Sequence, residues 1–212
     1  RNLGGIFLLL TFFWSIFDQS SSTRVFFARD HMELHGMAPD ALQGLNPVLV
    51  VVLSPIFAWV WRRAAAGEWK VRPTAKMVIG FILTTLCMGV MVVAGQLAAT
   101  GKVSVVWQMG AYVVITMAEL CISSVGLEMA YAESPKHMKS RVTAAFLLTV
   151  FFGNLLAGVV TSWYERMSPV RYFGLMTVML FGASCIFFVV VVRFERRKKM
   201  AVETGPIPVV AV

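Results

Sequence analysis

Six long apolar runs set the tightest limit on what this chain can fold into. Each is long enough to cross the hydrocarbon core of a bilayer as a helix, which takes about 20 apolar residues. None shows the alternation of apolar and polar residues that a strand of a membrane barrel requires. The runs lie near residues 4–28, 45–62, 75–98, 104–131, 140–163 and 170–193. The sequence therefore predicts an all-α membrane protein with six transmembrane helices.

The predicted six-helix bundle occupies residues 1–199, and a tail of residues 200–212 follows it. The tail contains Gly205, Pro206 and Pro208 and lacks helical periodicity, so we expect an extended or disordered cytoplasmic segment. The chain begins with an arginine and carries no recognisable signal peptide. We therefore expect it to be a fragment of a longer protein.

Composition and charge narrow the class of protein further. Hydrophobic residues make up 58% of the 212 residues and charged residues 14%, whereas soluble domains carry about 25% charged residues. A soluble enzyme is thereby excluded. The net charge of +8 comes from basic residues that gather in alternate loops, at 62–76, 136–141 and 193–199. The positive-inside rule then makes both ends cytoplasmic, and the basic run at 196–199 reads as a membrane-surface anchor rather than a nucleic-acid site.

Two acidic residues, Asp18 and Glu119, lie near the middle of the first and fourth apolar runs. A charged side chain at the bilayer centre costs about 2.5 to 3.5 kcal/mol on insertion scales, so such residues indicate function by default. The two runs cross the membrane in opposite directions, which places the acids at equivalent positions of two inverted three-helix units. A neutral, hydrogen-bonded packing role is the alternative for each acid.

Two further charges accompany these acids. Arg24 follows Asp18 by six residues, which puts the two side chains about 120° apart on one helix. We therefore expect Arg24 to extend to the outer interface and Asp18 to pair with a cation elsewhere. Glu128 lies nine residues after Glu119 toward the cytoplasmic end, and we interpret it as a structural or gating charge.

Helix breakers mark the second apolar run. Pro47 stands near its start and Pro55 in its interior, where a proline removes one backbone hydrogen bond and kinks the helix. We interpret both prolines as gating or structural residues. Asn46, just before Pro47, fits an N-cap and a ligand contact equally well.

The remaining patterns indicate structure rather than chemistry. The stretch HMELH at 31–35 spaces two histidines by four residues but offers no third metal ligand, and we interpret it as a solvated turn. No phosphate-binding glycine loop, nucleophile elbow or HExxH motif is present. The three cysteines, which we expect to be buried packing residues, are Cys87, Cys121 and Cys185. The small residues expected to form a packing face on the fifth run are Gly153, Asn154, Gly158 and Ser162.

Several stretches in sequence order resemble the proton-dependent oligopeptide transporters of the major facilitator superfamily. FFWSIFDQSSST is similar to the family's seventh helix and GLNPVLVVVLSPIFAWVW to its eighth. AELCISSVGLEMAYAESPKHMKS resembles the tenth helix with its following loop, and GNLLAG resembles part of the eleventh. The resemblance runs from about Phe12 to Gly158 and implies the C-terminal half of a twelve-helix fold, a 3+3 inverted repeat.

The resemblance also implies roles for individual residues. It gives Asp18 the place of the proton-coupling acid and Glu119 the place of the acid that holds the peptide's amino terminus. The further substrate-binding residues that follow from it are Asn46, Ser123, Phe146 and Thr149. The chain departs from the family pattern at Asp18, where Glu is commoner, at Ser124, where Pro is usual, and at Phe146, where Trp is usual, and the loss of the Trp N–H donor puts selectivity in doubt.

These observations predict a proton-coupled symporter of di- and tripeptides in a bacterial inner membrane, not an enzyme, with protons as coupling ion and no other cofactor. Its partners would be the peptide, the lipid bilayer and an N-terminal six-helix half of the same protein, which carries the family's remaining basic residues. Alternatives are a major facilitator transporter of another solute, such as nitrate, a glycoside or an exported drug, and a non-transporting receptor or assembly subunit. A membrane-embedded enzyme is the weakest alternative.

Overall fold

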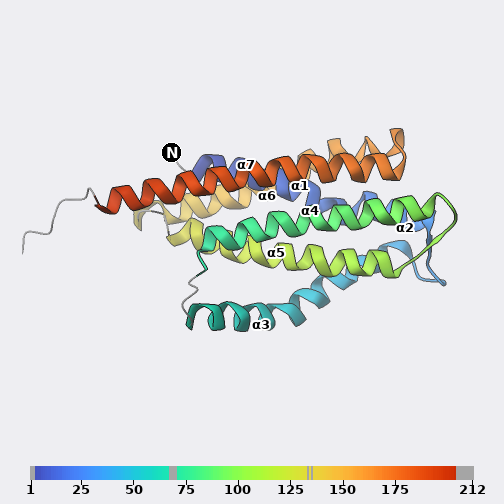
Figure 1. Cartoon of the computed structure of the whole chain (residues 1–212), viewed down its shortest axis with the longest axis horizontal. Coiled ribbons are helices and arrows are strands. Elements are labelled where there is room, and N and C mark those ends of the chain that lie inside the picture. The colour runs from blue at the N-terminus through green and yellow to red at the C-terminus, as the bar shows by residue number, and fades with distance from the viewer. Residues whose placement is uncertain (1–2, 67–70, 133, 135, 204–212) are drawn as a thin grey trace, which may run out of the picture.

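The six apolar runs form a bundle of antiparallel helical rods (Figure 1). The structure is a computed structural model that describes residues 3–66, 71–132, 134 and 136–203. Five helices in it are long and apolar enough to cross a membrane. These are α3 (Leu45–Ala66), α4 (Pro73–Ala98), α5 (Val106–Ala132), α6 (Lys139–Thr161) and α7 (Pro169–Glu203). Helix α7 thus continues four residues past the predicted bundle end, and the tail from residue 204 on lies outside the described residues.

The first predicted span is broken into three parts, which corrects the expectation of one continuous helix. Helix α1 (Leu3–Phe17) is followed by the 3-10 turn η1 (Asp18–Ser21) and then by α2 (Thr23–His31). Ser22 between them has φ −128° and ψ −91°, outside the helical region. Serine and threonine side chains compete for backbone hydrogen bonds, and the Ser22 hydroxyl donates to the Asp18 carbonyl at 3.3 Å. A run of four such residues therefore interrupts the helix inside the membrane span.

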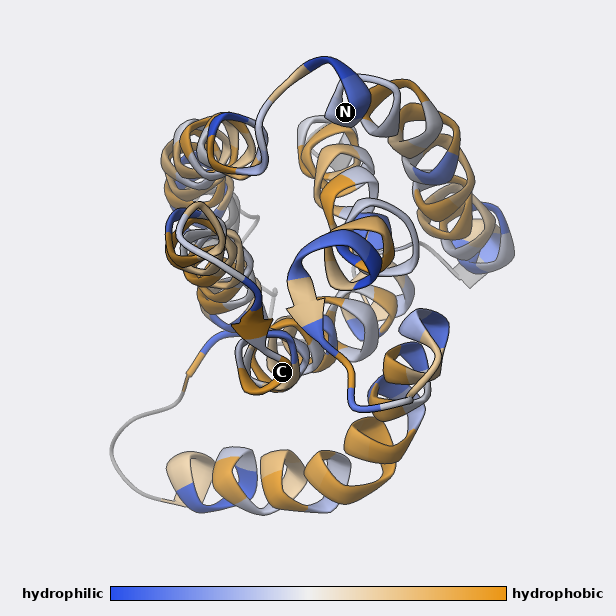
Figure 2. Cartoon of the chain, turned by 90° about the vertical axis from the view of Figure 1, so that its right-hand side faces the viewer, coloured by the Kyte–Doolittle hydropathy of each residue, from blue (hydrophilic) through white to orange (hydrophobic). Residues whose placement is uncertain are grey.

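The helices pack unequally. Helix α4 lies between α5 and α7, and α1 lies along α6, whereas α3 rests mainly on α5. Figure 2 shows α3 at the edge of the bundle, and none of its residues is buried. Pro55 lies inside α3 without ending it, and Figure 1 shows the helix changing direction along its length. The proline is thus a kink in a continuous helix, as a membrane helix tolerates.

Two hydrophobic clusters, stacked along the bundle, form the core. One surrounds Phe27, Tyr112 and Tyr172 near the loops that follow α2, α4 and α6. The other surrounds Phe81 and Phe187 toward the opposite end, where α1 begins and α7 ends. Phe81 and Phe187 stack with ring centroids 4.3 Å apart, which ties α4 to α7.

A small parallel strand pair joins two loops at the end near α2. Strand β1 (Met32–Glu33) pairs with β2 (Val103–Ser104). The HMELH stretch therefore contains a strand as well as a turn. Its two histidines separate: the His31 ring lies 5.2 Å from that of Phe27, whereas His35 has a positive φ of 49°.

The small-residue face predicted on α6 is only partly a packing face. A Cβ at Gly153 would overlap the Cβ of Trp14 and lie 3.0 Å from the Thr11 carbonyl oxygen, so α6 approaches α1 closely there. Asn154 and Gly158 instead face outward. The cysteines divide similarly, because Cys87 and Cys121 are buried while Cys185 is exposed on α7, contrary to expectation.

Candidate functional site

Glu119 and Asn46 come together from different helices. Asn46, the second residue of α3, donates from Nδ2 to Oε2 of Glu119 on α5 at 3.1 Å. The amide oxygen of Asn46 in turn accepts from the hydroxyl of Thr116, one turn before Glu119, at 2.5 Å. That hydroxyl also lies 2.8 Å from the Tyr112 carbonyl, so its single proton serves only one of the two acceptors at a time. The N–H₂ group of Asn46 faces Glu119.

This contact speaks against the N-cap interpretation of Asn46, and its contact with a ligand stays a prediction. The side chain is used across the helix interface, and it makes no capping bond to the α3 backbone in the described residues. Glu119 is half-buried, and the part of the chain that the structure describes offers its carboxylate no ion pair. A charged group that receives one neutral hydrogen bond retains acceptor capacity for a cation.

Asp18 is the other of the two acids predicted to lie near the middle of the membrane. It is half-buried at the start of η1, and its carboxylate has neither hydrogen bond nor ion pair among residues 3–66, 71–132, 134 and 136–203. The cation expected to pair with it is therefore not present in this part of the chain. The break between α1 and α2 begins at this residue, so Asp18 sits where the backbone departs from regular helix.

Arg24 does not extend to the outer interface, and this sequence expectation is wrong. The side chain is completely buried, with its guanidinium 4.3 Å from the centre of the Tyr112 ring. Its Nη2 donates to the Gln108 carbonyl at 3.5 Å and its Nη1 lies 3.7 Å from Cys87 Sγ. No carboxylate neutralises it within the described residues, and its Nε has no partner there. The Tyr112 ring and one backbone carbonyl, that of Gln108, hold this cation.

Gln19, which sequence analysis did not single out, anchors the broken span. Its Oε1 accepts from the Tyr172 hydroxyl at 2.7 Å, from Thr23 at 3.0 Å and from Thr161 at 3.2 Å. Its Nε2 donates to the Ser15 carbonyl at 2.9 Å. The amide thereby links η1 to α2, α6 and α7. The sequence feature that could have drawn attention to Gln19 is its position directly after Asp18.

Phe146 and Thr149 lie on the inner face of α6. Both are buried, at 3% and 4% exposed. The ring of Phe146 covers Gly126 of α5, where a Cβ would meet it at 2.5 Å, and meets the ring of Phe7 edge-on at 6.2 Å. Thr149 donates to the Phe146 carbonyl at 2.6 Å. A side-chain pocket at these residues would require the Phe146 ring to move.

The other predicted residues lie farther out. Ser123 is half-buried on α5, one turn after Glu119, and Pro47 is exposed one residue after Asn46. Pro55 and Glu128 are also exposed. The structure therefore brings Glu119 and Asn46 together across α3 and α5, with Ser123 one turn further along α5, while Phe146 and Thr149 are buried beneath α6.

The POT family model, PTR2, matches residues 3–188 of this chain. The chain therefore belongs to the POT family, and the match extends beyond the stretch from Phe12 to Gly158 whose motifs resemble the family. The six-helix bundle is accordingly part of the major facilitator fold of this family, whose members are transporters and not enzymes.

Individual relatives agree with the family assignment. A peptide transporter of Yersinia enterocolitica is 31% identical over 166 residues, which cover 73% of this chain and 32% of the relative. A di-/tripeptide transporter of Lactococcus lactis is 26% identical over 183 residues, covering 82% and 36%. The crystal structure of the POT family transporter PepTSo superposes with a TM-score of 0.80 at 28% identity, over 90% of this chain and 40% of that one. The chain thus spans about a third of the length of these curated relatives.

Proposed function

We propose that this chain is the C-terminal half of a proton-coupled symporter that carries di- and tripeptides by alternating access. The single observation that carries the proposal is the Glu119 carboxylate, oriented by Asn46 and left without a cation in the described residues. A peptide's ammonium group would supply that cation. In a poorly solvated site, opposite charges attract more strongly than in water.

Asp18 is the proposed proton-coupling residue. Its carboxylate lies inside the membrane span with no partner in the described part of the chain, so it can take up a proton or a cation from outside this bundle. The break at Asp18–Ser21 places it on a segment that differs from rigid helix. Reorientation of α2 relative to α1 would change the surroundings of the acid, as coupling requires.

The remaining parts of the proposal concern partners and place. The likeness to longer relatives supports an N-terminal six-helix half as the intramolecular partner. Helices α3 and α6, whose outer faces carry exposed Val51 and Phe151, would meet that half or the lipid. The basic ends favour both termini on the cytoplasmic side of a bacterial inner membrane. Protons are the only coupling ion in the proposal, and the gating movements would involve the start of α3 at Asn46, the kink at Pro55 and the part of α5 that carries Ser123.

The proposal is tested with the full-length protein in liposomes. Labelled dipeptide is supplied with and without an inward proton gradient, and accumulation that an uncoupler abolishes is the expected result. Asp18→Asn should lose gradient-driven accumulation while retaining peptide exchange at equal pH, since only the coupling step needs the acid. Glu119→Gln should raise the half-saturating concentration of peptides with free amines. Glu165→Gln, at an exposed acid between α6 and α7 that carries no assigned role, is the matched control.

Other outcomes would redirect the proposal. Intact accumulation by Asp18→Asn would remove that residue from coupling, and unchanged kinetics of Glu119→Gln would remove Glu119 from the binding site. Failure of excess unlabelled dipeptide to compete with a transported solute would favour the alternative of another substrate. Absence of any uptake by folded protein would favour a receptor or assembly subunit.

A further inference from the structure

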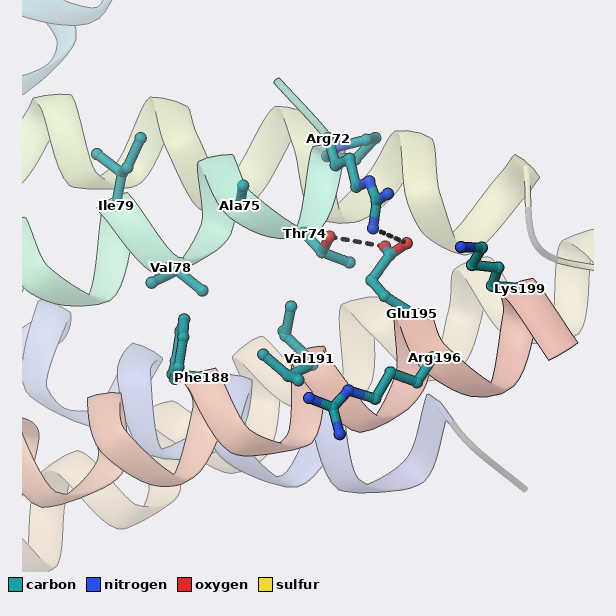
Figure 3. A pocket seen from close by; sticks show the side chains of 12 residues that line it. Arg72, Thr74, Ala75, Val78, Ile79, Phe188, Val191, Glu195, Arg196 and Lys199 are labelled. Atoms are coloured by element: carbon teal, nitrogen blue, oxygen red, sulfur yellow. Dashed lines mark hydrogen bonds and ion pairs between the residues drawn. The ribbon is translucent and has the colours of Figure 1, made fainter. Parts of the chain in front are cut away.

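A groove opens between the start of α4 and the last turns of α7, at the end of the bundle where the basic loops gather (Figure 3). Its volume is about 1000 Å³. The part that faces the middle of the membrane is apolar and is lined by Val78, Ile79, Phe188, Val191 and Val192. In Figure 3, Val78 on α4 points toward α7, and Phe188 and Val191 on α7 point toward α4.

The mouth of the same groove is charged. Arg72, Arg196 and Lys199 line it together with one acid, Glu195. Glu195 is held in place, because its Oε2 accepts from Arg72 Nη1 at 3.2 Å and its Oε1 from the Thr74 hydroxyl at 2.8 Å. Arg72 and Glu195 balance each other, and Arg196 adds a positive charge at the mouth that no acid of the described lining balances. The groove is therefore amphipathic along its length, apolar inside and cationic at its end.

The position of the groove points toward the bilayer. Helices α4 and α7 carry none of the candidate substrate or coupling residues, which lie on η1, α3, α5 and α6. The apolar part lies within the candidate membrane spans Pro73–Ala98 and Pro169–Arg197, and the cations lie at the ends of those spans. Cations at that level sit among lipid headgroups, where each Lys or Arg attracts anionic lipid.

We propose that this groove binds one anionic phospholipid of the adjacent leaflet. Its phosphate would lie by Arg196 and Lys199, beside the fixed Arg72–Glu195 pair, and an acyl chain would follow the apolar wall of Val78, Phe188 and Val192. The charge excess selects an anionic headgroup over a zwitterionic one, and the apolar wall distinguishes a lipid from free phosphate, which would use the mouth alone. The inference is independent of the proposed peptide transport.

The test uses the full-length protein in mixed bilayers of phosphatidylglycerol and phosphatidylcholine, released from nanodiscs for native mass spectrometry. One phosphatidylglycerol is expected to remain bound in preference to phosphatidylcholine. The double variant Arg196→Gln with Lys199→Gln should weaken its retention roughly 25-fold, from roughly fivefold for each cation removed. Val192→Trp, which fills the apolar wall without changing charge, should weaken retention as well. Arg62→Gln with Arg63→Gln, at the exposed end of α3, is the control with equal charge loss.

Each result decides the matter. Loss of phosphatidylglycerol in both groove variants, with retention in the α3 control and no displacement by inorganic phosphate, supports the lipid site. Equal loss in the α3 control would reduce the effect to general surface charge and overturn the proposal. Equal retention of both lipids, or complete displacement by inorganic phosphate, would overturn it too. So would a wild-type protein that retains no lipid, since another segment of the protein would then cover the groove.

Discussion

The side-chain amide of Asn46 holds the carboxylate of Glu119 and is itself bound by the Thr116 hydroxyl. Asn46→Ala removes the one hydrogen bond that the carboxylate receives in the described residues. Hydrogen bonds to charged groups contribute about 1.5 to 3 kcal/mol, so we expect the half-saturating dipeptide concentration to rise roughly tenfold or more. Uptake kinetics in liposomes measure this. Asn154→Ala, at an exposed asparagine of α6, should leave the kinetics unchanged, and an equal effect there would contradict a specific role.

Arg24 presents the opposite case, a buried cation whose shape matters more than its charge. Replacing a buried ion by an apolar side chain of similar volume is often neutral or stabilising, because the desolvation cost disappears. We therefore expect Arg24→Met to change the free energy of unfolding by less than about 1 kcal/mol, whereas Arg24→Ala should lose about 2 to 5 kcal/mol through the cavity beside Tyr112. Thermal unfolding in detergent compares the two. Similar losses in both variants would show that the contacts with Gln108 and Tyr112 stabilise the fold.

At the scale of elements, one glycine sets the distance between α1 and α6. A Cβ at Gly153 would overlap Trp14, whereas a Cβ at Gly158, on the same helix, would meet nothing within 4 Å. Gly153→Ala should therefore destabilise the protein by about 1 to 3 kcal/mol through overpacking. Gly158→Ala should stabilise it by about 0.5 to 1 kcal/mol, since alanine suits a helix better than glycine. Unfolding midpoints measured side by side test this contrast, and equal shifts in both variants would rule out the close contact at Gly153.

The elements also show where sequence patterns stop being informative. Hydrophobic length located the five helices that are long and apolar enough to cross a membrane, because the bilayer dictates how long an apolar helix must be. The same pattern could not locate the break after Phe17, since apolar residues continue on both sides of it and the cause is local competition by Ser and Thr side chains. Pro55 was predicted to kink its helix, and α3 indeed continues through it.

At the scale of the molecule, sequence patterns could single out candidate residues but not the partners that they contact in the fold. Glu119 and Asn46 were both singled out, but their hydrogen bond joins residues 73 apart in sequence, which no local pattern encodes. Arg24 was placed at the interface by its chemical type alone, whereas tertiary packing put it beneath Tyr112, 88 positions along the chain. Gln19 likewise became important only through the α6 and α7 side chains that converge on it.

The distribution of basic residues makes a prediction about the whole molecule in its membrane. The end of the bundle that carries Arg63 and the lipid groove should face the cytoplasm, and the loop that carries Lys102 should face outward. In a Cys185→Ser background, which removes the exposed native thiol, a membrane-impermeant maleimide should label Lys102→Cys in intact bacterial cells. It should label Arg63→Cys only after the membrane is opened. The reverse pattern would show that the molecule has the opposite orientation. It would place the groove between α4 and α7 in the outer leaflet and contradict the predicted topology.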